Sequence, residues 1–245
     1  GEIVRRIRKN KTATFGLIMI LVLIFTAVFA NFLAPYHYDD QDLDRRFLKP
    51  SLSHLFGTDE FGRDIFSRVI YGSRISLLVG FIAVGISLIL GGILGSIAGY
   101  YGGTLDNIIM RLMDIALSIP QILLAIAIAA SLGPGLMNLM IAVGISSTPK
   151  YARVIRASIL SIKNQEFIEA AKAVGCSDFR IITKHILPNC LAPIIVQTTF
   201  GVAVAILSAA ALSFIGLGIQ PPNPEWGAML SRGRKYIRDY PHLAI

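Results

Sequence analysis

Long stretches without any charged side chain are the feature that most constrains the fold of this chain. Asp, Glu, Lys and Arg are all absent from residues 12–36, 75–105, 115–149 and 186–224. A helix needs roughly 20 mainly apolar residues to cross a bilayer core of about 30 Å. Charged residues are only 16% of the chain, whereas a soluble domain carries about 25%, and the mean hydropathy is +0.64. This pattern predicts a polytopic membrane protein.

The expected fold class is all-α, a transmembrane helical bundle with five spans. We place these spans at residues 12–34, 75–101, 107–131, 136–159 and 189–218. The turn residues Gly133, Pro134 and Gly135 separate the third span from the fourth. A cleavable signal peptide is the alternative for the first span, but its apolar run exceeds the usual length of about 7–15 residues.

Basic residues predict which side of the membrane each loop faces. Lys and Arg are enriched in cytoplasmic loops, and the basic residues that precede the first span are Arg5, Arg6, Arg8, Lys9 and Lys11. We therefore expect a cytoplasmic N-terminus, an outer loop over residues 36–74, a cytoplasmic segment over residues 163–188 and an outer tail from Ile219. Most of the net charge of +8 then lies on inside segments, so it requires no nucleic-acid partner.

The fourth span carries its charges near its expected inner end. Lys150, Arg153 and Arg156 lie there, and long side chains at such positions can reach the lipid headgroups. No charged side chain is therefore expected deep within a span.

Three glycines in the second span repeat every four residues. Gly91, Gly95 and Gly99 share one face of a helix, and glycine there lets another backbone approach closely. These residues are predicted to pack helices together. Packing within this chain and packing against a partner chain are equally open.

The outer loop ends in the motif "GTDEFGRD" at residues 57–64. We expect a short amphipathic helix after it that buries Ile65 and Phe66, while Arg63, Asp64 and Arg68 face water.

Several kinds of chemistry are disfavoured by the sequence. No GxxxxGK[ST] motif provides a phosphate cradle for ATP, and no arrangement of serine, cysteine or histidine indicates a nucleophile. The acidic run at residues 39–44 imitates the start of a calcium loop, but Arg45 and Ser51 stand where glycine and glutamate are required. Cys176 and Cys190 lack zinc-site spacing. We expect no catalytic, cofactor or metal site on this chain.

Residues 163–188 place several charged side chains between two apolar runs. Four apolar residues recur at helical spacing and predict one face of a short helix: Phe167, Ala170, Ala171 and Val174. Gly175 is a natural helix stop, and Ser177 can cap a second helix. The residues alone leave two possibilities equally open, a helix resting in the lipid headgroups and a helix that docks on a partner.

This segment resembles a known signature. Glu169-Ala170-Ala171, Gly175 and Leu187-Pro188 are spaced like the EAA signature of ABC importer permeases. That signature usually has isoleucine where this chain has His185, but the dipeptide/oligopeptide/nickel branch commonly reads "KHILPN", as residues 184–189 do. Further motifs similar to the C-type permease subunit of that branch are "GTDEFGRD", "YGSRISLLVG" (71–80), "AGYYGG" (98–103), "ALSFIGLGIQPPNPEWGAML" (211–230) and "GRKYI" (233–237).

The resemblance implies a type I ABC importer permease fold over residues 1–245 as a single transmembrane domain. The family has a sixth span after the outer tail, which we expect to lie beyond Ile245. Its signature forms a coupling helix that docks on a cytoplasmic ATPase. The residues implied in coupling are Glu166, Glu169, Ala170, Ala171, Gly175, Asp178, His185 and Pro188.

The implied function is that of a non-catalytic permease subunit in the bacterial inner membrane, which imports di- or oligopeptides. The implied partners are a homologous second permease, two cytoplasmic ATPase subunits that bind ATP and Mg²⁺, and an external solute-binding protein. Glutathione and nickel or another metal chelate remain open as cargo. A self-sufficient secondary transporter or channel is disfavoured, because such proteins usually carry acidic groups or broken-helix ion sites within the membrane.

Overall fold

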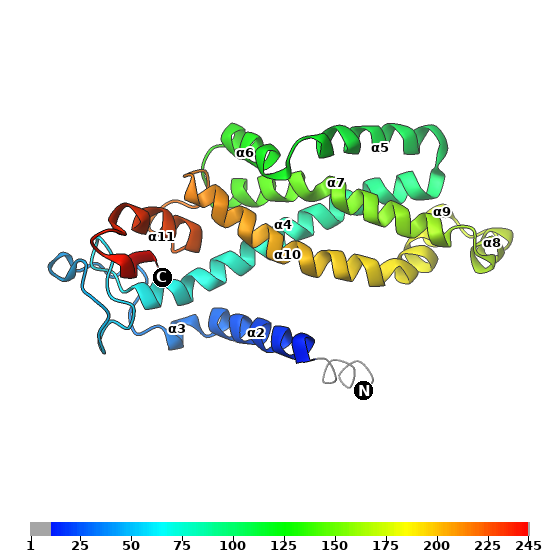
Figure 1. Cartoon of the computed structure of the whole chain (residues 1–245). Helices are drawn as coiled ribbons and strands as arrows, with labels where there is room; N and C mark the ends of the chain where they lie inside the picture. Colours follow the sequence, from blue (N-terminus) through cyan, green and yellow to red (C-terminus); the bar gives the residue numbers. More distant parts are fainter. Residues whose placement is uncertain (1–10, 245) are drawn as a thin grey trace. The chain divides into compact units, whose positions relative to one another are not determined.

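The structure is a computed structural model that describes residues 11–244, and its regular elements in that range are all helical (Figure 1). One isolated backbone bridge joins Thr58 and Asp64. The predicted all-α class is therefore confirmed. Arg5, Arg6, Arg8 and Lys9, on which the predicted orientation partly depends, lie outside the described residues.

The helices are α2 (Lys11–Val28), α3 (Ala30–Leu33), α4 (Ile65–Tyr101), α5 (Gly103–Ser118), α6 (Gln121–Leu132), α7 (Leu136–Ile162), α8 (Glu166–Ala173), α9 (Asp178–Arg180), α10 (Leu191–Phe214) and α11 (Trp226–Gly233). Between α9 and α10 the chain stays helical through a π-turn at Ile181–Ile186 and a 3₁₀ turn at Leu187–Cys190. Further 3₁₀ turns cover Leu43–Arg45, Arg234–Tyr236 and Pro241–Ala244.

The number of spans differs from the prediction of five. Within the described residues, three helices are long and apolar enough to cross a membrane: Lys11–Val28, Ile65–Tyr101 and Asp178–Phe214. The predicted third span is two helices, α5 and α6, that meet at 92° and count as a fourth span only if taken together. Pro120 explains the break, because proline lacks a backbone N–H and pushes the preceding Ile119 to an extended conformation.

The predicted fourth span is helical but is not among those candidates. It corresponds to α7, whose 27 residues correspond to about 40 Å at 1.5 Å per residue. Lys150 lies near the middle of α7, whereas Arg153 and Arg156 lie closer to its C-terminal end. The predicted bounds, 136–159, nevertheless match α7 closely, because the helix begins at the same residue and ends three residues later.

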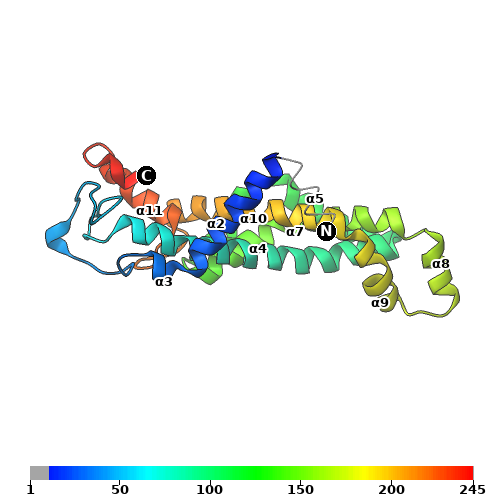
Figure 2. The same ribbon diagram turned by 90° about the horizontal axis from the view of Figure 1, so that it is seen from below.

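The chain forms two compact units, which are described separately. The terminal unit comprises Gly1–Leu78 and Ser213–Ile245, and the central unit comprises Val79–Leu212. α4 and α10 each contribute residues to both units. Figure 2 shows the same elements after a quarter turn.

Within the central unit, α4 packs against α7 so closely that its contact positions have no room for a side chain. A Cβ atom built on Gly91 would lie 2.5 Å from the Cβ of Tyr151, and one built on Gly95 would lie 2.5 Å from the backbone oxygen of Ala152. The same construction on Gly99 meets Ile159 at 3.0 Å. The face formed by these glycines therefore contacts another helix of this chain.

In the terminal unit, the charged residues around the start of α4 are buried. Arg63, Asp64 and Arg68 are only 2%, 4% and 1% exposed, so the prediction that they face water is wrong. The Asp59 carboxylate lies 2.7 Å from the Arg63 guanidinium, and Arg68 donates to the backbone oxygen of Tyr38 at 2.6 Å. Charges can be buried when they are paired and hydrogen-bonded, and helical spacing alone does not reveal that pairing.

Candidate functional site

The segment between α7 and α10 is held to the helices by a small apolar cluster. Ile168 and Ala171 of α8 are buried there. The other buried members come from α7 and from the start of the Asp178–Phe214 helix, and they are Ile155, Ile159, Ile181, Ile186, Cys190 and Ile194. Both views show α8 beyond the end of α7 (Figures 1 and 2). The cluster therefore fixes a short projecting helix to the ends of two long ones.

The buried face of α8 is not the one predicted from the sequence. Of the four residues expected on its apolar face, only Ala171 is buried, whereas Phe167, Ala170 and Val174 are exposed. Ile168 was missed, although Ile168 and Ala171 are three residues apart and share a face. In an eight-residue helix with apolar residues on two faces, either face could be the buried one. Only the packing against neighbouring helices decides which it is.

The exposed surface of α8 and of the chain that follows it, as far as Phe179 of α9, carries acidic and apolar side chains, together with Lys172. We call its acidic and apolar part the docking surface, and the residues of that part are Glu166, Phe167, Glu169, Ala170, Val174, Gly175 and Phe179. Val174 and Phe179 are 79% and 78% exposed. Large exposed apolar side chains beside charged ones are typical of protein interfaces.

Gly175 ends α8 in the manner expected. Its φ is +79°, a conformation that glycine adopts freely. Its N–H donates to the backbone oxygen of Lys172 at 2.9 Å, and the N–H of Cys176 donates to that of Ala171 at 3.1 Å. These two bonds form the Schellman pattern that reverses a chain after a helix. Ser177 starts the next helix, but its side chain makes no capping hydrogen bond.

Side chains of the segment also contact the end of α4. The Tyr100 hydroxyl donates to an Asp178 carboxylate oxygen at 2.7 Å, and the Lys172 ammonium lies 5.6 Å from the centroid of the Tyr100 ring. The Lys163 ammonium donates to the backbone oxygen of Gly99 at 3.0 Å. The segment therefore contacts α4 as well as α7 and α10.

His185 and Pro188 belong to an irregular stretch that the sequence analysis did not predict. Proline removes one backbone donor from a helix, and the chain here widens into a π-turn over Ile181–Ile186. The Asn189 side chain donates to the backbone oxygen of His185 at 2.7 Å, within this irregular stretch. The only sequence signal for this irregularity is Pro188 itself.

A hollow lies in the terminal unit and contains none of the predicted coupling residues. It has a volume of about 610 Å³ and is lined in part by Arg63, Arg232, Lys235 and Tyr236. The terminal guanidinium nitrogens of Arg232 have no hydrogen-bond partner among the described residues. Burial, with a further contribution from Arg63, lowers the pKa of Arg232 below its usual value.

Metal chemistry finds no support in the part of the chain that the structure describes. No group of three or more His, Cys, Asp or Glu side chains gathers in residues 11–244 in a way that could hold a metal ion. The two cysteines are not joined in a disulfide.

Two family models match the chain. Residues 91–234 match the model described as binding-protein-dependent transport system inner membrane component. Residues 1–50 match the N-terminal transmembrane domain of oligopeptide transport permease C.

Curated relatives cover nearly the whole chain. A dipeptide transport system permease protein of Alkalihalophilus pseudofirmus is 52% identical over 244 residues, which is 100% of this chain and 80% of the relative. A di/tripeptide transport system permease protein of Pseudomonas aeruginosa is 47% identical and covers 93% of this chain and 77% of its own length. A glutathione transport system permease protein of Escherichia coli is 46% identical over 100% of this chain and 81% of the relative.

Solved structures share the fold at low sequence identity. The methionine ABC transporter MetNI in an inward-facing conformation matches with a TM-score of 0.58 at 20% identity, over 70% of this chain and 81% of that one. An amino acid ABC transporter with histidines matches with a TM-score of 0.55 at 18% identity, over 73% of this chain and 83% of that one. The expected ABC importer permease fold is thus confirmed, with the corrected number of apolar spans.

Proposed function

Because the chain belongs to the family of binding-protein-dependent transport system inner membrane components, we propose that it forms half of the translocation pathway of an ATP-driven peptide importer. It is a multi-pass membrane protein and a permease subunit of an ABC importer. Di- or oligopeptides are the proposed cargo, because the most similar relatives reported above are named for dipeptide and di/tripeptide transport.

One observation carries the proposed mechanism. Ile168 and Ala171 pack α8 against the ends of the long helices. The side chains of the docking surface are exposed and have no partner among the described residues. A cytoplasmic ATPase that binds this surface can displace α4, α7 and α10 together when it moves. ATP binding then closes the two ATPase subunits, and the coupled helices switch the pathway between inward and outward access.

The alternative of a helix resting in the headgroups fits the geometry less well. An interfacial helix buries its apolar face in lipid and presents basic residues to the polar side. In α8 the fully buried apolar residue Ile168 faces the protein, and the exposed surface carries Glu166 and Glu169. The single basic residue of α8, Lys172, lies with its ammonium 5.6 Å from the centroid of the Tyr100 ring. Anionic headgroups would repel the carboxylates of Glu166 and Glu169.

The charge pattern supports an orientation with α8 in the cytoplasm. Lys163, Lys172, Arg180 and Lys184 all lie in this segment, as basic residues do in short cytoplasmic loops. The N-terminus is then cytoplasmic, and residues 36–64 and the tail after α10 face outward. ATP and Mg²⁺ bind to the ATPase partners, a homologous permease completes the pathway, and an external solute-binding protein delivers the cargo.

Glutathione is the second candidate cargo, because a relative at 46% identity is named for its transport. Glutathione is itself a tripeptide, so the two candidates share a peptide backbone and free carboxylates. The ligand that the partner binding protein retains on purification distinguishes them.

Transport by the reconstituted complex tests the proposed function. The chain is assembled in lipid vesicles with the second permease and the ATPase subunits, and the binding protein is supplied outside with a labelled dipeptide. We expect uptake that requires both ATP and the binding protein. Equal uptake without the ATPase subunits would contradict the proposal and favour a secondary transporter or channel.

A further inference from the structure

Three polar cross-links join α7 to the α5–α6 pair in the central unit. Arg156 pairs with Asp106 at 2.5 Å, and Arg153 pairs with Asp114 at 2.6 Å. Lys150 differs, because its ammonium donates to the Gln121 side-chain oxygen at 2.6 Å. Each arginine thus has a carboxylate partner, whereas Lys150 has only a neutral amide, and no carboxylate of the described residues lies within ion-pair distance of it.

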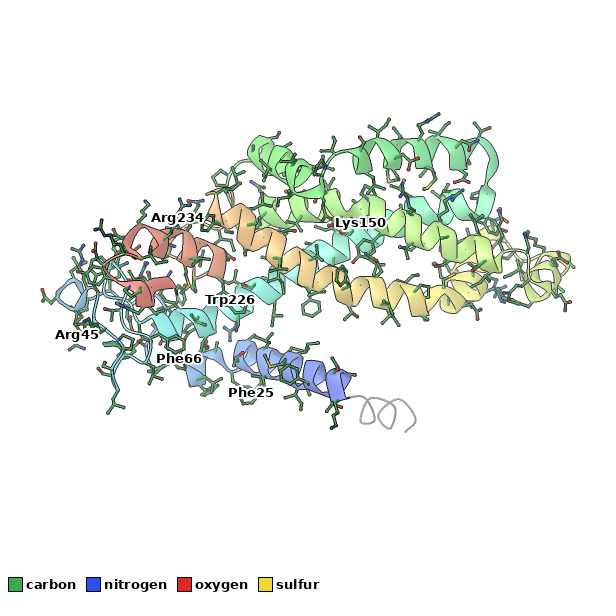
Figure 3. The ribbon with its side chains drawn as sticks, viewed as in Figure 1. Phe25, Arg45, Phe66, Lys150, Trp226 and Arg234 are labelled. Carbon is green, nitrogen blue, oxygen red and sulfur yellow. The ribbon has the colours of Figure 1, made fainter. Side chains whose placement is uncertain are left out.

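Lys150 lies deep along the helices and not at their ends. Figure 3 labels it near the middle of α7. The flanking residues Thr148 and Tyr151 contact α4 at Gly91, which is close to the middle of the charge-free part of that helix, residues 75–101. By length and composition α4 is one of the candidate spans, and a membrane centred on its charge-free part would place Lys150 near mid-depth.

A cation at this depth is unfavourable against lipid. Charged residues within spans almost always face a bundle interior or a water-filled path, and they mark substrate or ion pathways. The Lys150 side chain is exposed on the surface of this chain. An exposed cation of this kind suits the space shared with the second permease of the proposed assembly better than it suits the acyl chains.

Other polar groups gather beside Lys150. The Gln121 side-chain N–H donates to the Ser147 hydroxyl at 2.8 Å, so Gln121 is held between Ser147 and Lys150. A cavity of about 30 Å³ adjoins them and is also lined by Tyr151 and Gln197. That volume exceeds the space one water molecule needs, about 10–15 Å³, so the site can be wet.

We propose that Lys150, supported by Gln121 and Ser147, binds the terminal carboxylate of a peptide in the translocation pathway. A lysine ammonium has three donors, and only one is engaged by Gln121. The remaining donors and the uncompensated charge suit an anionic carboxylate, because charge-assisted hydrogen bonds are roughly twice as strong as neutral ones. Every unmodified peptide carries this group, so the site would hold cargo regardless of side-chain sequence. The inference rests on the proposed peptide cargo.

Direct binding of a labelled dipeptide to the permease–ATPase complex in lipid nanodiscs tests this site. The solute-binding protein is left out, because its own affinity would dominate. The dipeptide is compared with its C-terminal amide, which lacks the anionic group. We expect Lys150→Met to weaken binding of the free acid about tenfold, as expected for loss of a hydrogen bond to a charged group, and to leave binding of the amide unchanged.

Two matched variants separate charge from position. Lys150→Arg keeps the cation and should retain the preference for the acid over the amide. Arg153→Met removes the next cation of α7, whose charge is already compensated by Asp114, and should also retain that preference. If Lys150→Met cannot be recovered, Lys150→Gln keeps a polar group opposite Gln121 and takes its place.

Several results would overturn the site. Unchanged acid binding by Lys150→Met would do so, as would an equal loss of acid and amide binding, which would indicate a purely structural role. Loss of the second permease subunit from both the Met and Gln variants would make Lys150 an assembly contact instead.

ATP-dependent uptake by the wild-type complex is measured alongside. Uptake without acid–amide discrimination overturns only this site, whereas a wild type that neither binds nor imports peptide overturns the proposed function too.

Discussion

At the scale of single residues, one carboxylate near the start of α4 serves two arginines. Asp59 lies 2.7 Å from Arg63 and 3.8 Å from Arg68, and both arginine side chains are almost completely buried. Removing one partner of a buried ion pair leaves an uncompensated charge, which is far more unfavourable than losing an exposed pair. Local stability of the terminal unit therefore depends on Asp59.

We predict that Asp59→Asn destabilises the terminal unit by about 3–5 kcal/mol. Asp42→Asn is the matched control, because Asp42 pairs with Arg45 at 3.1 Å but both side chains are about half exposed, and such pairs contribute about 0–1 kcal/mol. Thermal unfolding of the purified complex, combined with limited proteolysis of residues 36–64, measures both changes. Equal stability of the two variants would show that burial does not strengthen the Asp59 pairs.

At the scale of helices, the sequence predicted some elements well and others poorly. The glycine repeat of α4 and the stop at Gly175 could be predicted because each has a local backbone cause. The buried face of α8 could not, since Ile168 and Phe167 are equally apolar and only the cluster around Ile155 and Ile181 selects between them. The break at Pro120 was not predicted, because the residues on both sides of it are uncharged and read as one continuous span.

Gly91→Leu should disrupt the contact between α4 and α7. A leucine side chain would overlap Tyr151 and the backbone of Ala152, and overpacking of this kind destabilises by about 1–3 kcal/mol or more. Gly85→Leu is the matched control on the same helix, because nothing lies within 4 Å of a Cβ built there. The yield of intact complex from membranes is the measurement. Equal yields and equal transport for both variants would argue against tight α4–α7 packing.

Gly175→Val should misdirect α8 without unfolding the long helices. Valine at a φ of +79° costs about 1–2 kcal/mol, whereas asparagine tolerates this region, so Gly175→Asn should act weakly. We expect reduced co-purification of the ATPase with the valine variant only. The contrary outcome is full ATPase retention by Gly175→Val, which would mean that the turn does not set the position of the docking surface.

At the scale of the whole molecule, composition and motifs predicted the membrane class and the family, because both are properties of long stretches of sequence. The number of apolar spans was not predicted, since α7 carries three basic residues in its second half and α5 and α6 are bent apart by 92°. The proposed division of labour also belongs to this scale. In this proposal the helices of this chain change position to open and close the pathway, and a separate protein hydrolyses ATP.

We predict that the purified chain has no ATPase activity and that activity appears only when the ATP-binding subunits are added. The reason is the missing GxxxxGK[ST] phosphate cradle in the sequence. Phosphate release is measured for the single chain and for the assembled complex. ATP turnover by the single chain above the level of a mock preparation would refute this division.

The central claim, that α8 is the coupling helix, is tested most directly by reversing the charge of Glu169. This residue is exposed on the docking surface, so Glu169→Lys should leave the fold intact while a misplaced charge against the ATPase disfavours the contact by several kcal/mol. Glu169→Gln removes the charge without reversing it and should have a smaller effect. ATP-dependent peptide uptake and ATPase co-purification are measured together for both variants. The account predicts that Glu169→Lys loses uptake while the chain is recovered normally from membranes. Normal uptake with normal ATPase retention would contradict it and leave α8 as a helix resting at the membrane surface.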